Sequence, residues 1–96
     1  MQYVLIGIKG KEGKSPQFEE CIGKPCSIVA EVGRTGLFQF DGGGFLITTT
    51  IQDKISKYGL VRVETRNTIY TFEENVGRTI NGVYFPPVPT KEAVSA

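Results

Sequence analysis

The chain has 96 residues and a mass of 10.5 kDa, with 40% hydrophobic and 22% charged residues, which is the size and composition of one small folding domain. Eleven Lys and Arg against ten Asp and Glu give a net charge of +1, which argues against a dedicated nucleic-acid-binding protein. The sequence contains no His, which excludes His-based metal sites and catalytic triads.

The first half of the chain alternates short apolar stretches with glycines, a pattern typical of β-strands joined by tight turns. We expect strands at residues 2–9, 26–32, 37–40 and 45–51. Ser15 followed by Pro16 predicts a short helix over residues 16–21, because proline is favoured at the first position of a helix.

A hairpin is expected around the glycine-rich loop at residues 41–44. If that four-residue loop joins the strands, Phe40 lies opposite Phe45 and Phe38 lies opposite Ile47. All four side chains would then share one face, and we expect this hairpin to form the centre of the core.

Residues 60–72 show the clearest alternation of apolar and polar side chains, on both sides of Arg66-Asn67. Asn tolerates the positive φ of a tight hairpin turn, so a two-residue loop is expected there. This register sets Val63 opposite Tyr70 and turns the alternate polar side chains outward.

Asn81-Gly82 predicts a further small hairpin near the C-terminal end, because this dipeptide favours a two-residue turn. The sequence thus predicts a mainly β protein, a small antiparallel barrel or sandwich of about six to eight short strands with one short helix. We expect a single β-rich domain over residues 1–86, followed by a proline-containing extended segment and disordered tail at 87–96.

Val-Gly-Arg-Thr occurs twice, and both copies fall at predicted turns. Arg34 and Thr35 in the first copy, and Arg78 and Thr79 in the second, could bind a phosphate through guanidinium forks and hydroxyls. Lys14, in a glycine-rich loop, is a further candidate for holding an anion. The alternative is two unrelated turns and a solvated loop, since loops readily recruit these residue types.

No grouping of side chains in the sequence resembles a catalytic centre or a metal site, so we expect neither an enzyme nor a cofactor. Cys21 and Cys26 are expected to be reduced thiols, with a disulfide as the alternative. Several strands carry apolar residues on both faces, which in so small a domain predicts barrel closure, a covering segment or a homo-oligomer.

The stretch 47–72 resembles small uncharacterised proteins of phages and Gram-positive bacteria. Their final hairpin has the form Val-x-Thr-x-Asn-x-x-Tyr-x-Phe, matched here by Val63, Thr65, Asn67, Tyr70 and Phe72. Many such phage proteins are non-enzymatic inhibitors of bacterial defence.

The resemblance implies a binding protein in the cytoplasm of the bacterial host cell. It would sequester a nucleotide-type signal within a homo-oligomer, or block a host defence protein. The alternative is a structural or assembly component such as a small virion accessory protein. We expect no specific nucleic acid and no membrane as partner, because the charge is balanced and no apolar run reaches ~20 residues.

Overall fold

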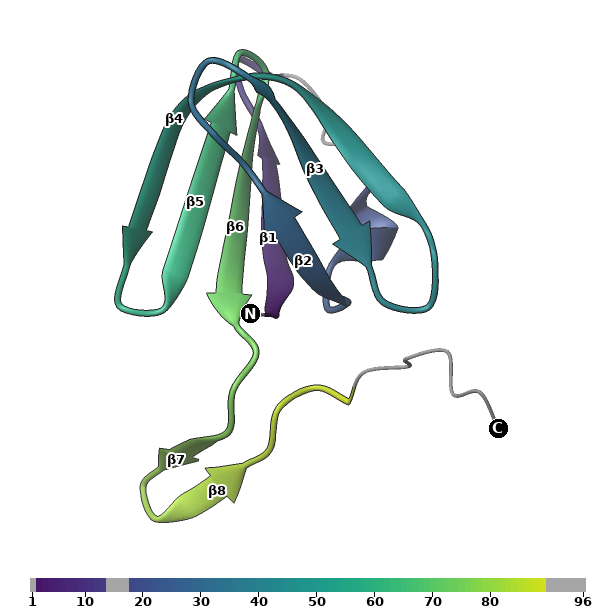
Figure 1. Ribbon diagram of the computed structural model, residues 1–96. Helices are drawn as coiled ribbons and strands as arrows, with labels where there is room; N and C mark the ends of the chain where they lie inside the picture. Colours follow the sequence, from purple (N-terminus) through teal and green to yellow (C-terminus); the bar gives the residue numbers. More distant parts are fainter. Residues whose placement is uncertain (1, 14–17, 90–96) are drawn as a thin grey trace.

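The structure, a computed structural model, describes residues 2–13 and 18–89 and confirms the mainly β prediction. The described residues form the following strands, shown in Figure 1: β1 (Tyr3–Gly10), β2 (Pro25–Val29), β3 (Thr35–Phe40), β4 (Phe45–Lys57), β5 (Leu60–Thr65), β6 (Thr68–Glu74), β7 (Arg78–Ile80) and β8 (Val83–Phe85). One 3-10 turn, η1 (Glu19–Cys21), stands where the short helix was expected; residues 16 and 17 of that helix lie outside the described residues.

Strands β1 to β6 form a closed antiparallel barrel in which each strand pairs with the next in sequence (Figure 1). β6 returns to pair with β1 along nearly its whole length, from Tyr3 opposite Glu74 to Gly10 opposite Thr68. Closure pairs the first and last strands of the barrel with each other, although residues 52–57 of β4 pair with β5 alone. Of the two architectures left open by the sequence, the structure shows the barrel.

The hairpin of β5 and β6 has the predicted register, with Val61 opposite Phe72 and Val63 opposite Tyr70. Val63 and Phe72 are fully buried, and the Phe38 ring lies edge-on to both Tyr70 and Phe72, with ring centroids 5.1 and 4.7 Å apart. Aromatic rings in this arrangement contribute stability beyond their buried area. This hairpin therefore supplies much of the barrel core.

The predicted register of the β3–β4 hairpin is wrong by one residue, because Phe38 lies opposite Leu46 rather than Ile47. The amide of Phe40 donates a hydrogen bond of 3.0 Å to the carbonyl of Gly44, so the chain reverses within residues 41–43. Glycines at 42–44 all adopt positive φ, which allows this tighter loop. As a result Phe45 and Ile47 point outward, whereas Phe38 and Leu46 are buried.

Strand β4 is longer than expected, extending to Lys57 instead of ending near residue 51. Its first part pairs with β3 and its second part with β5, and the register shifts between Ile51 and Asp53. The sequence pattern did not predict the second part as a strand. β2 is shorter than expected, ending at Val29.

The predicted hairpin at Asn81-Gly82 is confirmed, with both turn residues at positive φ. Its strands, β7 and β8, form a separate two-stranded sheet beyond the barrel end at which β1 starts and β6 finishes (Figure 1). The closed barrel thus ends with β6, and residues 75–88, here called the arm, project from it.

Candidate binding surfaces

Arg34 and Thr35, the first predicted phosphate-binding pair, lie at the turn between β2 and β3. The side chain of Arg34 is 80% exposed, and its Nε lies 3.6 Å from a carboxylate oxygen of Glu31. Thr35 begins β3 opposite Thr50 of β4. Both residues face solvent and are free to contact a ligand, but neither is enclosed.

Arg78 and Thr79, the second predicted pair, lie in β7 of the arm. The guanidinium of Arg78 forms an ion pair of 2.5 Å with Glu73. β7 lies beyond the opposite end of the barrel from the β2–β3 turn (Figure 1), so one protomer does not bring the two arginines together. Lys14, the third candidate, lies outside the described residues.

The structure reveals a polar hollow of about 410 Å³ that no pattern in the sequence predicted. It is lined by Thr49, Thr50 and Gln52 of β4 and by Arg66 and Asn67 of the β5–β6 turn. Among these described residues there is a guanidinium, two hydroxyls and two amides, and no carboxylate. Such a set suits an anionic ligand, because a phosphate accepts hydrogen bonds from all of these groups.

The polar hollow adjoins one of the two predicted pairs. Thr50, which lines it, pairs with Thr35, and the amide of the next residue, Ile51, donates a hydrogen bond of 2.8 Å to the carbonyl of Arg34. Arg66 was not identified as a site residue because the sequence pattern explains it fully as part of a hairpin turn. Arg66 comes close to Thr49, Thr50 and Gln52 of β4 only in the folded barrel.

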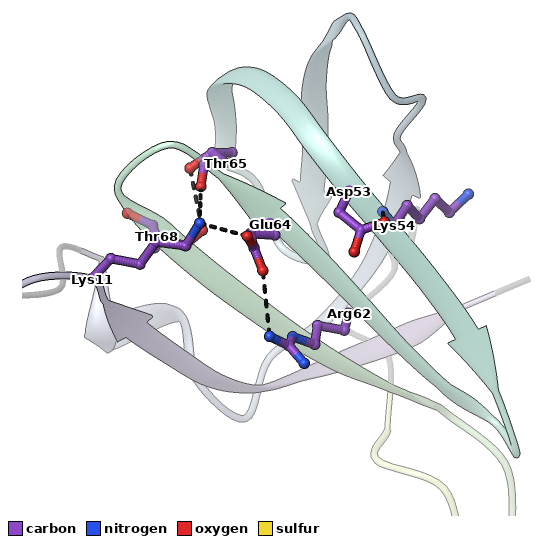
Figure 2. Close-up of polar contacts among 7 residues, drawn as sticks. All are labelled: Lys11, Asp53, Lys54, Arg62, Glu64, Thr65 and Thr68. Carbon is purple, nitrogen blue, oxygen red and sulfur yellow. Dashed lines mark hydrogen bonds and ion pairs between the residues drawn. The ribbon is translucent and has the colours of Figure 1, made fainter.

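The outer side of β5 and its neighbours is charged, as Figure 2 shows. Lys11 Nζ lies 2.6 Å from Glu64 Oε2 and donates a second hydrogen bond of 2.8 Å to the carbonyl of Thr65, and Arg62 Nη2 lies 3.3 Å from Glu64 Oε1. The hydrogen bond from Lys11 is the main cause that lowers the pKa of Glu64 below its usual range. This network links the residue that follows β1 to β5 on the outer side of the barrel.

The outer side of β2, β3 and β4 is apolar instead. Two rows of outward residues cross the three strands: Val29, Leu37 and Ile47, and next to them Ser27, Gln39 and Phe45. None of these six side chains is charged. We call Val29, Leu37, Phe45 and Ile47 the apolar face; three of them are exposed by 64% (Val29), 66% (Phe45) and 62% (Ile47).

The two cysteines do not form a disulfide. Burial raises the pKa of the Cys26 thiol to about 12, and burial is also the main cause that raises the pKa of Cys21. A thiol reacts as its thiolate, so a raised pKa suppresses nucleophilic chemistry at both positions.

Within residues 2–13 and 18–89, no group of three His, Cys, Asp or Glu side chains is arranged to hold a metal ion. The same residues include no helix with the length and apolar content needed to cross a membrane. Comparison with family models, curated proteins and solved structures finds no match to this chain.

Proposed function

We propose that this protein is a non-enzymatic binding protein that acts by covering a surface of another protein. This is the partner-blocking form of the phage anti-defence role implied by the resemblance of residues 47–72. The observation that carries the proposal is the apolar face on β2, β3 and β4.

The apolar face is not needed to build the core. Its residues alternate along each strand with buried ones, so that Phe38 and Leu46 already fill the interior while Leu37 and Ile47 point outward. Nothing among the described residues covers it. A contiguous exposed apolar surface on a small domain supports a role in protein–protein contact.

The composition of the apolar face also indicates the chemical character of the partner surface. Because the six outward side chains of both rows carry no charge, a complementary surface would be apolar with a few hydrogen-bonding groups. Phe45 is the largest side chain on the face, and exposed aromatic residues are frequent anchors of binding energy.

The test uses two isoleucines of the same strand. Ile47→Ser changes the apolar face, whereas Ile55→Ser changes an exposed isoleucine of β4 that lies opposite Arg62 on the charged side. Each variant is expressed in bacteria that carry one cloned antiviral defence system from a panel, and phage plaque counts are measured. The wild type and Ile55→Ser should restore plaques against one system, and Ile47→Ser and Phe45→Ser should not.

All three variants should keep the wild-type melting temperature, since the changed side chains are exposed. Calorimetry with the purified target should then show affinity reduced roughly tenfold or more by Phe45→Ser. Equal activity of the Ile47 and Ile55 variants would contradict the proposal.

The polar hollow favours a second candidate, sequestration of a phosphorylated nucleotide. Calorimetry against linear and cyclic nucleotides tests it: Arg66→Ala should weaken binding roughly ten- to hundredfold, because a charge-assisted contact to phosphate is lost. Arg78→Ala, at the far end of the molecule, is the matched control and should have no effect. Absence of binding at high micromolar nucleotide would leave protein contact as the proposed function.

A further inference from the structure

The arm, residues 75–88, carries a β-hairpin that meets the barrel only near one end, where Arg78 pairs with Glu73 and where Phe85 lines a hollow together with Val4 and Ile6 of β1. Ile80, Val83, Tyr84 and Phe85 are each more than half exposed, and Figure 1 shows β7 and β8 standing clear of the barrel strands. A two-stranded hairpin is at best marginally stable in water on its own. Two three-residue strands therefore need an additional strand or a surface to stabilise them.

The arm is nevertheless held in a defined position at its root. The side chain of Asn75 exchanges two hydrogen bonds with the backbone of Val88, of 3.0 and 2.8 Å, so the beginning and end of the arm are tied together. Arg78 is paired with Glu73 of β6. The hairpin is thus presented to solvent in one orientation, which lowers the entropic cost of pairing with a partner.

The inside of the hairpin is also well defined. Asn81 and Gly82 adopt φ of 52° and 78°, as a tight two-residue turn requires. A Cβ atom at Gly77 would collide with the Tyr84 ring, so glycine allows this ring to lie against the start of the arm. Because side chains alternate along a strand, Val83 and Phe85 lie on the face of β8 opposite to Tyr84.

The outer edge of β8 carries neither charge nor bulge, although the strand is only three residues long and is followed by Pro86 and Pro87. Residues 52–57 of β4, which pair only with β5, carry Asp53, Lys54 and Lys57 along an unpaired edge. Charged side chains of this kind discourage pairing with other chains. β8 has the sequence Val-Tyr-Phe, with no charge and no bulge.

The edge of β8 is complementary to itself. Two copies related by a two-fold axis through Tyr84 would pair antiparallel, with Val83 of each chain opposite Phe85 of the other. Cross-strand pairs of aromatic and β-branched side chains are favourable in antiparallel sheets. The one charged residue of the two strands, Arg78, lies on β7, away from this edge, and is neutralised by Glu73, so the pairing brings no like charges together.

We propose that β8 is a pairing edge for a second copy of this chain, which joins two barrels through a four-stranded sheet ordered β7–β8–β8–β7. The interface is isologous, so it closes as a dimer and does not propagate. It is also small, and we expect a dissociation constant on the order of tens of micromolar. The inference does not rest on the apolar face, which stays exposed in such a dimer.

The test measures the mass of the full chain by light scattering and analytical ultracentrifugation over a concentration series. Wild type should move from 10.5 kDa toward twice that mass as concentration rises. Val83→Lys and Phe85→Glu should each weaken dimerisation roughly tenfold or more, because the symmetric dimer contains each change twice. Mixing the two variants should restore dimers, since the introduced lysine then faces the introduced glutamate.

Ile80→Lys is the matched control. Ile80 pairs with Val83 and is equally exposed, 54% against 55%, but it lies on the strand away from the pairing edge. It should therefore leave the dimer nearly intact. A wild type that stays at 10.5 kDa at all concentrations overturns the proposal. The proposal also fails if Ile80→Lys weakens the dimer as much as Val83→Lys does. That result would indicate that the face of the hairpin, and not the edge of β8, forms the contact. Phe45→Ser, used to test the proposed function, should not affect the dimer.

Discussion

The barrel has two outer sides of opposite character. Around β5, the outward residues Arg62 and Glu64 are charged, and Glu64 forms ion pairs with both Arg62 and Lys11. Across β2, β3 and β4, the equivalent outward positions hold Val29 and Ile47, which remain more than 60% exposed.

The difference shows that strand patterning alone does not decide the chemistry of an outer face. Both sides alternate with buried residues of the same core, so both satisfy the requirements of folding equally well. Charged side chains at exposed positions are expected, because water solvates them well. The apolar side therefore calls for an explanation outside folding, and the proposed contact with another protein would supply one.

The largest expected effect comes from introducing a charge on the inner side of β5. Val63→Asp places a carboxylate where exposure is 0% and should cost at least ~4 kcal/mol, enough to unfold a domain of this size. Arg62→Ala, one residue away on the exposed side, should cost no more than ~1 kcal/mol. Urea denaturation of both variants measures this; similar losses would show that the β5–β6 register is wrong.

An intermediate effect separates the two faces of β4. Leu46→Ala removes a side chain that is 3% exposed and should cost ~2–4 kcal/mol, whereas Ile47→Ala, exposed by 62%, should cost no more than ~0.5 kcal/mol. The register first expected from the sequence predicts the reverse order. Chemical denaturation of the pair therefore decides between the two registers.

The smallest effect concerns the ion pairs of the charged side. Because the pKa of Glu64 is lowered in the folded state, its contribution to stability is complete above its ordinary value of 4.5 and is lost as the pH falls through the lower folded-state value. Glu64→Gln should therefore be less stable than wild type at pH 7, and the difference should shrink as the pH falls below 4.5. A stability difference that does not change with pH would rule out this role for the carboxylate.

The sequence predicted those hairpins whose turns permit only one loop length. Asn81 and Gly82 in the arm form a two-residue loop with both residues at positive φ, as expected. The β5–β6 register is also found, but Asn67 does not adopt the positive φ expected of it, so the alternation of side chains predicted that register and the turn residue did not. Residues 41–44 contain three consecutive glycines, which accept several loop lengths at little cost. The register of β3 and β4 is consequently decided by which side chains fill the core.

The candidate surfaces were harder to predict than the strands. The polar hollow joins Arg66 to Thr49 and Thr50, which lie on a different hairpin, so no local pattern reveals it. The apolar face depends on a register that the sequence left undetermined. The isolation of the arm could not be predicted either, because the same local pattern forms a hairpin whether or not a core lies beneath it.

The pairing of β1 with β6 also has a consequence for the folding pathway. The first strand of the barrel finds its long partner only in the last, with Tyr3 opposite Glu74. Closing so long a loop is entropically costly, and proteins dominated by such distant contacts fold slowly, in milliseconds to seconds. During synthesis, the barrel therefore cannot close until β6 has emerged. Until then, the strand segments that pair with β6 in the finished barrel have no partner within the chain, and unpaired strand segments are the ones most open to contact with other chains.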